Sequence, residues 1–268
     1  MPGKGLIGTI AGGSFVNMVF SVIIPTYNRL NTLKEVLKYL ERQTFPLDRF
    51  EVLVVDDGST DGTLDFISNY RGCLNLVPLS TGLPSGVYGY WFALNLGLDR
   101  SVGEYAVFLD SDMVPRWDAL EKLYEAHLRW ERQGEKVAIR PWWVRRKNIL
   151  KMWFRHETFS RYSVNKALER NKKFKKLYSR RHNLKPKDAV SAFLSVRKEY
   201  IFEAGGLTQG TEYGLDGEFQ ERLVRVASVK LVFEPEVYAI HGPVRGDVKA
   251  DAYRRLSGSV SSSGTFGS

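Results

Sequence analysis

The chain has 268 residues, 43% of them hydrophobic, which is enough for one large α/β domain or two small ones. Its single cysteine, Cys73, cannot form an intramolecular disulfide, and no Asn-x-Ser/Thr acceptor occurs, so composition argues against a disulfide-stabilised secreted domain and favours a cytoplasmic setting. The formal net charge is +9 and is unevenly spread, which implies a locally basic surface.

Residues 1–17 are expected to form an N-terminal extension before the domain. No charged residue occurs from Gly5 to Asn28, a pattern that a signal peptide or membrane anchor would share. However, the stretch contains four glycines, and its last part, Phe20 to Ile24, has the β-branched density of a buried strand. We therefore favour a soluble strand over a membrane segment.

The first half of the chain alternates strand-like and helical patterns, which is typical of βαβ units with a mainly parallel sheet. A helix with the apolar stripe Leu33, Val36, Leu37 and Leu40 should follow the first strand, with Asn31 and Thr32 as capping candidates. Two further helices are expected, one after residues 59–61 and one over residues 87–98. The expected strands are Phe20–Ile24, Glu51–Val55, Leu74–Val77 and Tyr105–Leu109.

A helix over residues 117–130 and a strand over residues 137–139 lead into a basic insertion, residues 140–187. The insertion contains 17 Lys and Arg but two acidic residues, Glu157 and Glu169, and the rest of the chain carries 22 basic and 28 acidic residues. Part of it should be a basic amphipathic helix. Its expected stripe is Val164, Leu168, Phe174 or Lys175, and Tyr178.

Three roles fit the basic insertion. It could make a peripheral contact with an anionic membrane surface, bind a polyanionic acceptor, or be a solvated face over ordinary packing. Because aromatic residues cluster with the charges, we favour the membrane or anionic-acceptor role, with nucleic acid as a less favoured partner.

After the insertion, the pattern predicts an apolar run over residues 189–196, a helix over residues 216–227 and a strand over residues 229–233. The C-terminal tail, residues 246–268, should be disordered from residue 257, because its last 12 residues contain six Ser and three Gly. The whole pattern predicts an α/β fold with a mainly parallel central sheet flanked by helices.

Each early strand ends in polar residues: residues 25–28, 56–59 and 110–112. The carboxyl ends of parallel strands lie at one edge of an open α/β sheet, where such folds bind ligands. Asp110 and Asp112 could both reach a divalent cation such as Mn²⁺ or Mg²⁺, which prefers oxygen ligands. A solvated turn is the simpler interpretation of this triplet by itself, and its position after a buried strand is what favours a metal site.

Several motifs in order resemble the family 2 glycosyltransferases of the GT-A fold. They are FSVIIPTYNR at residues 20–29, VVDDGSTD at 54–61, GEY at 103–105 leading to LDSD at 109–112, and AGGL at 204–207. The resemblance covers roughly residues 19–241. It implies one GT-A domain over residues 18–245, with a Rossmann-like nucleotide-sugar-binding half (18–115) and an acceptor half (116–245).

The resemblance also implies site roles. Tyr27 and Asp57 would contact the base of the donor, with Pro25 shaping the pocket. Asp110 would lie near the ribose or help to hold the metal, and Asp112 would bind Mn²⁺ or Mg²⁺. The donor would be a nucleotide sugar, with a UDP-sugar favoured, and the acceptor a glycan or lipid-linked hydroxyl.

Downstream, LDGEFQER at residues 215–222 resembles the family motif whose first aspartate is the catalytic base, which points to Asp216, with Glu218 as the second acid. Asp216 could equally just open its helix, where an acid favours the N-terminal dipole. His241 lies where related enzymes carry a histidine that completes the metal shell, although a hydrogen-bonded structural role fits as well. Attack by the acceptor would invert the anomeric configuration.

The sequence departs from the family pattern in two places. Ala93-Leu94-Asn95 stands where the family often has Ala-Arg-Asn, so a basic contact near the nucleotide is missing or supplied elsewhere, and Leu215 replaces the Glu before the catalytic aspartate. Two rival functions are a nucleotidyltransferase, which should carry a Gly-rich phosphate loop near the first strand, and a non-catalytic nucleic-acid-binding protein. The sequence Pro-Thr-Tyr-Asn after the first strand and the retained carboxylates argue against them.

Overall fold

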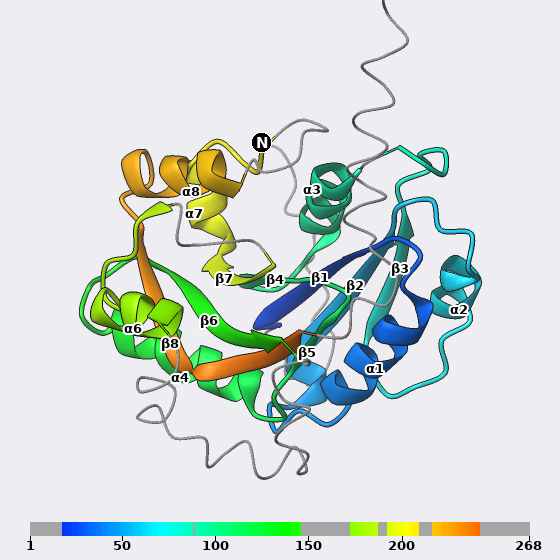
Figure 1. Ribbon diagram of the computed structural model, residues 1–268, viewed down its shortest axis with the longest axis horizontal. Coiled ribbons are helices and arrows are strands. Elements are labelled where there is room, and N and C mark those ends of the chain that lie inside the picture. Colours follow the sequence, from blue (N-terminus) through cyan, green and yellow to red (C-terminus); the bar gives the residue numbers. More distant parts are fainter. Residues whose placement is uncertain (1–17, 88, 146–171, 187–191, 209–215, 242–268) are drawn as a thin grey trace, which may run out of the picture.

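A computed structural model describes residues 18–87, 89–145, 172–186, 192–208 and 216–241. These residues form an α/β fold around one curled eight-stranded sheet with the strand order β3-β2-β1-β4-β7-β6-β8-β5 (Figure 1). The fold class predicted from the sequence is therefore confirmed. The strands are β1 (Phe20–Thr26), β2 (Phe50–Asp56), β3 (Leu76–Ser80), β4 (Tyr105–Leu109), β5 (Met113–Pro115), β6 (Val137–Arg145), β7 (Phe193–Arg197) and β8 (Lys230–His241).

The first four strands pair in parallel, with Val22 opposite Val52 and Val107. β1, β2 and β4 are buried along their whole length, as expected for strands covered on both faces. The predicted strand Tyr105–Leu109 is observed with the same ends. The strand predicted over residues 74–77 is displaced to Leu76–Ser80, a partly exposed edge strand whose residues alternate between the two faces.

The second half of the sheet is mixed, because β7 pairs antiparallel with β4 and with β6, and β5 pairs antiparallel with β8. Four of the seven pairings among the described strands are parallel. β6 and β8 run further than the sequence pattern predicted, to Arg145 and His241, because each supplies the other's hydrogen bonds over most of that length. The basic insertion thus begins as a sheet strand.

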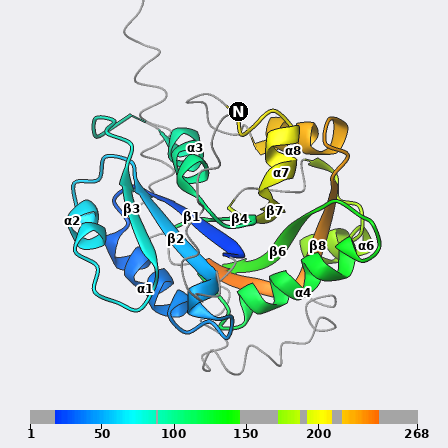
Figure 2. The ribbon, with the colours of Figure 1, turned by 180° about the vertical axis from the view of Figure 1, so that it is seen from behind.

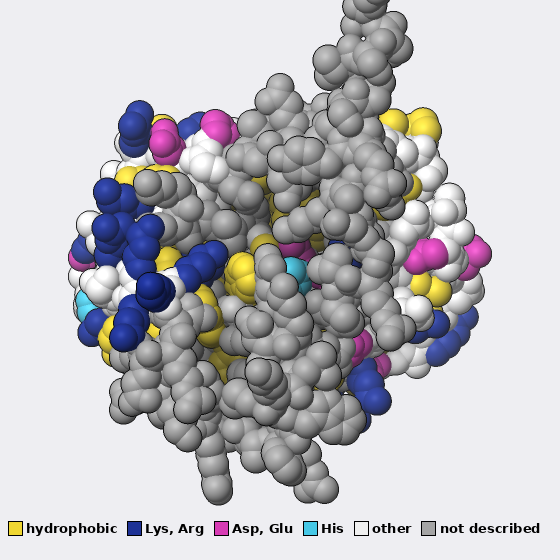
Figure 3. Space-filling view, viewed as in Figure 1, with side chains coloured by type: hydrophobic (Ala, Val, Ile, Leu, Met, Phe, Trp, Pro, Cys, Tyr) yellow, Lys and Arg dark blue, Asp and Glu magenta, His cyan; other side chains and the backbone are white. Residues whose placement is uncertain are grey.

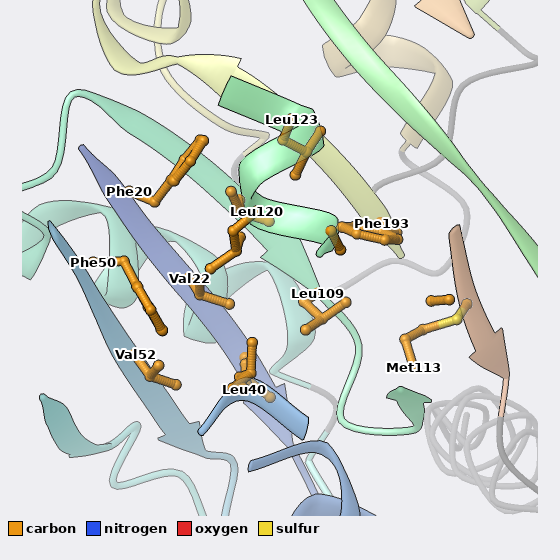
Figure 4. Close-up of a cluster of buried hydrophobic side chains, with 14 of the residues drawn as sticks. Phe20, Val22, Leu40, Phe50, Val52, Leu109, Met113, Leu120, Leu123 and Phe193 are labelled. Atoms are coloured by element: carbon orange, nitrogen blue, oxygen red, sulfur yellow. The ribbon is translucent and has the colours of Figure 1, made fainter. Parts of the chain in front are cut away.

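Helices cover both faces of the sheet (Figures 1 and 2). One apolar cluster joins the sheet to α1, α2 and α4, and a second joins it to α3, α6, α7 and α8. In the first cluster, Leu40 of α1 and Leu120 and Leu123 of α4 lie with Val22 and Leu109 of the sheet (Figure 4). The helices are α1 (Leu30–Leu40), the 3-10 helix η1 (Leu47–Arg49), α2 (Thr63–Ser68), α3 (Tyr90–Arg100), α4 (Ala119–Glu131), α6 (Lys172–Ser179), α7 (Lys198–Glu203) and α8 (Asp216–Arg225).

The predicted stripe of α1 is confirmed, since all four of its leucine and valine residues are buried. The predicted caps are wrong, because Asn31 and Thr32 lie inside the helix. Instead, the Leu30 N–H donates to Asp61 Oδ2 at 3.0 Å. Burial alone would raise the pKa of Asp61, but hydrogen bonds from Thr63 and Leu30 outweigh it and lower the pKa. A carboxylate distant in sequence therefore caps α1.

Other expectations are met in part. Phe174 and Leu177 form the buried side of α6, and Tyr178 is half-buried. Val164 and Leu168 lie outside the described residues, as do the N-terminal extension and the C-terminal tail. The sequence pattern did not predict β5 or α7. None of the helices in the described part of the chain is long and apolar enough to cross a membrane.

Candidate active site

Asp112 lies at the centre of a small charged cluster beyond the carboxyl end of β4. Its Oδ2 accepts a hydrogen bond from Arg29 Nη1 at 2.9 Å and lies 3.2 Å from His241 Nε2. Asp112 and His241 are buried, and Arg29 is nearly so. The antiparallel pairing of Met113 with His241 brings the end of β8 to this place. Three segments distant in sequence thus meet at one carboxylate.

Asp110 is part of the same turn but faces another partner. Its Oδ1 accepts a hydrogen bond from the Tyr90 hydroxyl at 3.0 Å, and its backbone carbonyl accepts one from the Met113 N–H at 2.9 Å. The turn interpretation of the triplet is therefore correct for the backbone. The side chains of Asp110 and Asp112 nevertheless contact separate groups, from α3, from the residue before α1 and from β8, so the turn brings three parts of the chain together.

Asp57 fixes the loop that follows β3. It is buried, and its carboxylate accepts hydrogen bonds from the Thr81 hydroxyl at 3.1 Å and from the Gly89 N–H at 2.8 Å. The Tyr27 hydroxyl lies 3.0 Å from Ser85 Oγ in the same loop. Tyr27 and Asp57 thus both contact the segment after β3, residues 81–87 and 89, at the edge of the sheet where β1 and β2 end.

The loop after β2 approaches the same segment closely. Gly58 has a φ of +77°, and a Cβ at this position would lie 2.7 Å from the Leu83 carbonyl oxygen. Glycine is therefore required there both by the backbone conformation and by the close approach. Pro25, next to this edge, is buried within β1 opposite Val55.

Comparisons with known proteins identify the family of the chain. Residues 21–203 match the family described as Glycosyl transferase family 2. The chain belongs to this family. The matched span includes β1 to β7 and ends before α8 and before His241.

Several family 2 relatives are similar over part of the chain. The poly(ribitol-phosphate) beta-N-acetylglucosaminyltransferase TarS of Staphylococcus aureus is 45% identical over 95 residues, which is 35% of this chain and 16% of TarS. Glycosyltransferase AglE of Haloferax volcanii is 38% identical over 103 residues, 38% of this chain and 33% of AglE. The chain thus spans well under two thirds of the length of either curated relative.

Solved structures share the fold. S. aureus TarS 1-349 in complex with UDP-GlcNAc superimposes with a TM-score of 0.60 and 22% identity, over 89% of this chain and 64% of that one. The mannosyltransferase PcManGT from Pyrobaculum calidifontis, in complex with GDP-Man and Mn2+, gives a TM-score of 0.59 at 22% identity, over 91% of this chain and 64% of that one. At this identity the likeness establishes the GT-A fold.

Two of the predicted site residues, Asp216 and Glu218, come from α8. Asp216 is the first residue of α8, and its side chain lies outside the described atoms. Glu218 is ion-paired with Arg222 and accepts a hydrogen bond from the Thr208 hydroxyl. The Arg222 guanidinium holds the pKa of Glu218 below its usual value. Arg222 also donates to the Ala204 carbonyl at 2.6 Å, so Glu218 helps to fix α8 to the segment after α7.

Sequence reasoning missed two residues of the cluster, Arg29 and Tyr90. Arg29 lies three residues after β1, and a cation next to the predicted polar strand ends was a usable signal. Tyr90 opens α3, and nothing in its local sequence distinguishes it from a core aromatic residue. Leu94, at the position where the family often has Arg, is fully buried in the core.

The cluster fits a hard divalent cation. Within the described residues no group of three or more His, Cys, Asp and Glu side chains is assembled as a metal site. However, Mg²⁺ and similar ions need only one or two carboxylates when substrate phosphates and water complete the shell. Asp112 and His241 are in contact, and the buried His241 Nδ1 has no hydrogen-bond partner among the described residues. An oxygen ligand with an imidazole nearby suits Mn²⁺ as well as Mg²⁺.

Proposed function

We propose that this chain is a hexosyltransferase that moves a sugar from a nucleoside-diphosphate sugar, with a UDP-sugar favoured, to an acceptor hydroxyl. The observation that carries the proposal is the meeting of Arg29, Asp112 and His241 at the carboxyl edge of the sheet. This is the edge where α/β folds bind ligands, and a diphosphate needs a cation or metal there. Two structural neighbours contain UDP-GlcNAc and GDP-Man in their complexes, which supports the donor class.

In this proposal residues 18–115 form the nucleotide-sugar-binding half and residues 116–245 the acceptor half of one GT-A domain. Tyr27 and Asp57 contact the base, with Pro25 shaping the pocket. Asp110 would serve the ribose or the metal, and Asp112, with His241, would hold Mn²⁺ or Mg²⁺. The ion would neutralise the charge that develops on the leaving diphosphate.

Arg29 and the helix α8 complete the chemistry. Arg29 lies beside Asp112 and supplies a positive charge at the diphosphate position. Asp216, at the first position of α8, accepts the proton of the acceptor hydroxyl as that oxygen attacks the anomeric carbon. Glu218 is the second acid of this motif. Attack opposite the leaving group inverts the anomeric configuration.

The acceptor is a hydroxyl of a glycan or of a lipid-linked or other anionic acceptor. The name of TarS gives poly(ribitol-phosphate) as its acceptor, and the basic insertion of this chain suits a negatively charged polymer. A cytoplasmic enzyme with a peripheral membrane location would reach such an acceptor where the acceptor is lipid-linked, because a basic segment is attracted to anionic lipid headgroups.

A panel of nucleotide sugars tests the donor and the metal together. Thermal unfolding of the full chain is measured with each donor, with and without Mn²⁺, for the native protein and for Asp112→Asn. We expect a Mn²⁺-dependent rise in Tm with one donor and none in the variant, since binding to the folded state alone stabilises it. If no donor stabilises the native protein, or if the variant responds equally, the assigned site is wrong.

Product analysis tests the mechanism. NMR of the anomeric proton in the transferred sugar gives its configuration relative to the donor. Retention of configuration would exclude single displacement with Asp216 as base.

A further inference from the structure

The described end of the basic insertion, residues 172–186, has seven Lys and Arg and no acidic residue. Lys172, Lys173, Lys175 and Lys176 on α6 are all exposed. Like charges three and four residues apart on a helix repel one another by a few tenths of a kcal/mol per pair. Four lysines on eight residues make this face strongly cationic, and such a face attracts polyanions.

The apolar side of α6 is already occupied by the protein core. Phe174 and Leu177 are almost fully buried, and the Phe174 ring packs edge-on against Trp142 at a centroid distance of 4.9 Å. Helices that lie on membranes insert their apolar face into the lipid. In α6 that face is turned inward, so only its cationic face is presented outward. This argues for charge recognition over membrane insertion.

The basic face is also held rigidly. In the turn after α6, the Leu184 N–H donates to the Leu231 carbonyl and the Arg181 carbonyl accepts from the Phe233 N–H, both at 2.7 Å. These bonds tie the turn to β8, the strand that ends at His241. A pre-ordered cationic surface loses little conformational entropy when it binds.

Aromatic contacts link this face to the active site. Lys173 Nζ lies 5.2 Å from the centre of the Trp143 ring, and the Trp143 ring packs against the His241 ring at a centroid distance of 5.4 Å. In the space-filling view, Lys and Arg side chains gather over α6 and extend towards α8, while acidic and histidine side chains show nearer the centre of the same face (Figure 3). Trp143 thus connects the basic face of α6 to His241, at the edge where the sugar is transferred in the proposed function.

We propose that the exposed cationic face of α6 is a docking surface for a linear polyanionic glycan or polyol-phosphate chain, which then passes over Trp143 to the transfer site. This inference deepens the proposed function and rests on it, because the proposed transfer site sets the direction in which the polymer runs from α6. Nucleic acid fits less well, because single-stranded nucleic acid is held by stacking on exposed aromatic rings. Trp142 and Phe174 are buried, and Trp143 is half-buried.

The test measures binding of fluorescently labelled poly(glycerol phosphate) to the full chain by anisotropy over a range of salt concentrations. The variant Lys172→Gln/Lys175→Gln removes two exposed charges from α6. The matched control Lys34→Gln/Lys38→Gln removes two exposed charges from α1, on the opposite face of the sheet. We expect about a tenfold loss of affinity for the α6 variant and a salt slope lower by about 2, with no change in the control, because each phosphate contact releases counterions.

Two further probes separate the partners. Vesicles of phosphatidylglycerol and an oligodeoxythymidylate are tested at the same salt. Tighter binding of either than of poly(glycerol phosphate), or equal binding by the α6 variant and the native chain, would overturn the proposal. The donor-dependent rise in Tm is measured on the same variants. If the native chain shows no donor-dependent rise in Tm but binds the polymer in a charge-dependent way, the proposed function is refuted and the docking surface still stands.

Discussion

The two halves of the sheet are built in different ways. In residues 18–115 the main strands are parallel and each ends at the same edge, so Tyr27, Asp57 and Asp110 come together through repeated local units. In residues 116–241 antiparallel pairing dominates the contacts that reach the site, and His241 arrives from the far end of a 12-residue strand. The placement of the site residues in the first half therefore follows from local sequence patterns, whereas in the second half it depends on the register between strands distant in sequence.

The largest expected effect concerns the border between the halves. Phe108 of β4 and Phe219 of α8 are both fully buried, with ring centroids 6.4 Å apart. Phe108→Ala should lower the free energy of unfolding by about 3–5 kcal/mol, because it leaves a cavity in a closely packed core. Denaturant unfolding of Phe108→Ala, of Phe219→Ala and of the double variant measures the coupling between the two residues. Strictly additive losses with two separate transitions would mean that the halves are independent domains.

Asp112→Asn should nearly abolish transfer while leaving the fold in place. The change removes the charge shared by Arg29 and His241. Loss of one electrostatic group at a reacting centre typically costs about 10²–10³-fold in kcat. Steady-state kinetics with the donor found by thermal shift provide the measurement, and circular dichroism checks the fold. Activity within a few-fold of the native level would place the metal elsewhere.

The sequence predicted the first half better than the second for a physical reason. The stripe of α1 and the strand Tyr105–Leu109 follow from periodicity within a short segment, so the structure confirms them. The contact of Asp112 with His241 depends on the pairing of β5 with β8, and no local pattern encodes that register.

The same reason explains the smaller errors. The cap of α1 comes from Asp61, 31 residues away, which overrides the local candidates Asn31 and Thr32. The strand ends of β6 and β8 also depend on each other, so neither could be set from its own residues. The edge of the sheet that carries the candidate site could still be predicted, because the polar residues come directly after buried strands.

His127 should make stability depend on pH through the second half of the sheet. It is fully buried on α4, with Nε2 2.8 Å from Ser195 Oγ of β7. Burial, with help from Arg197, lowers the pKa of His127 to about 3, whereas its ordinary value is 6.5. Between these values the unfolded chain binds a proton that the folded chain does not, so stability falls as pH falls.

The expected loss due to His127 is about 2 kcal/mol between pH 8 and pH 5. Chemical denaturation of the native chain and of His127→Gln across this pH range isolates the contribution of His127 to the pH dependence of stability, since the carboxylates contribute equally to both proteins. The variant should be less stable at pH 8 but show a shallower decline towards pH 5. Parallel declines would mean that His127 is protonated in the folded protein.

The smallest expected effect concerns Gln220, one turn after Asp216 on α8. Gln220 is fully buried, and neither atom of its amide has a hydrogen-bond partner among the described residues. Gln220→Met keeps the volume and removes the unsatisfied groups, so it should leave stability unchanged or raise it by about 1 kcal/mol. Gln133→Met, on an exposed residue after α4, is the matched control and should change stability by less than about 0.5 kcal/mol.

The activity of Gln220→Met sharpens the comparison between the halves. A polar group retained at a cost in stability is typical of functional sites. Higher stability with lower kcat would indicate that the first turns of α8 hold a reacting group, as proposed for Asp216. Higher stability with unchanged kcat would show that the amide is dispensable for transfer, and the contribution of α8 would then rest on Asp216 and on the ion pair of Glu218 with Arg222.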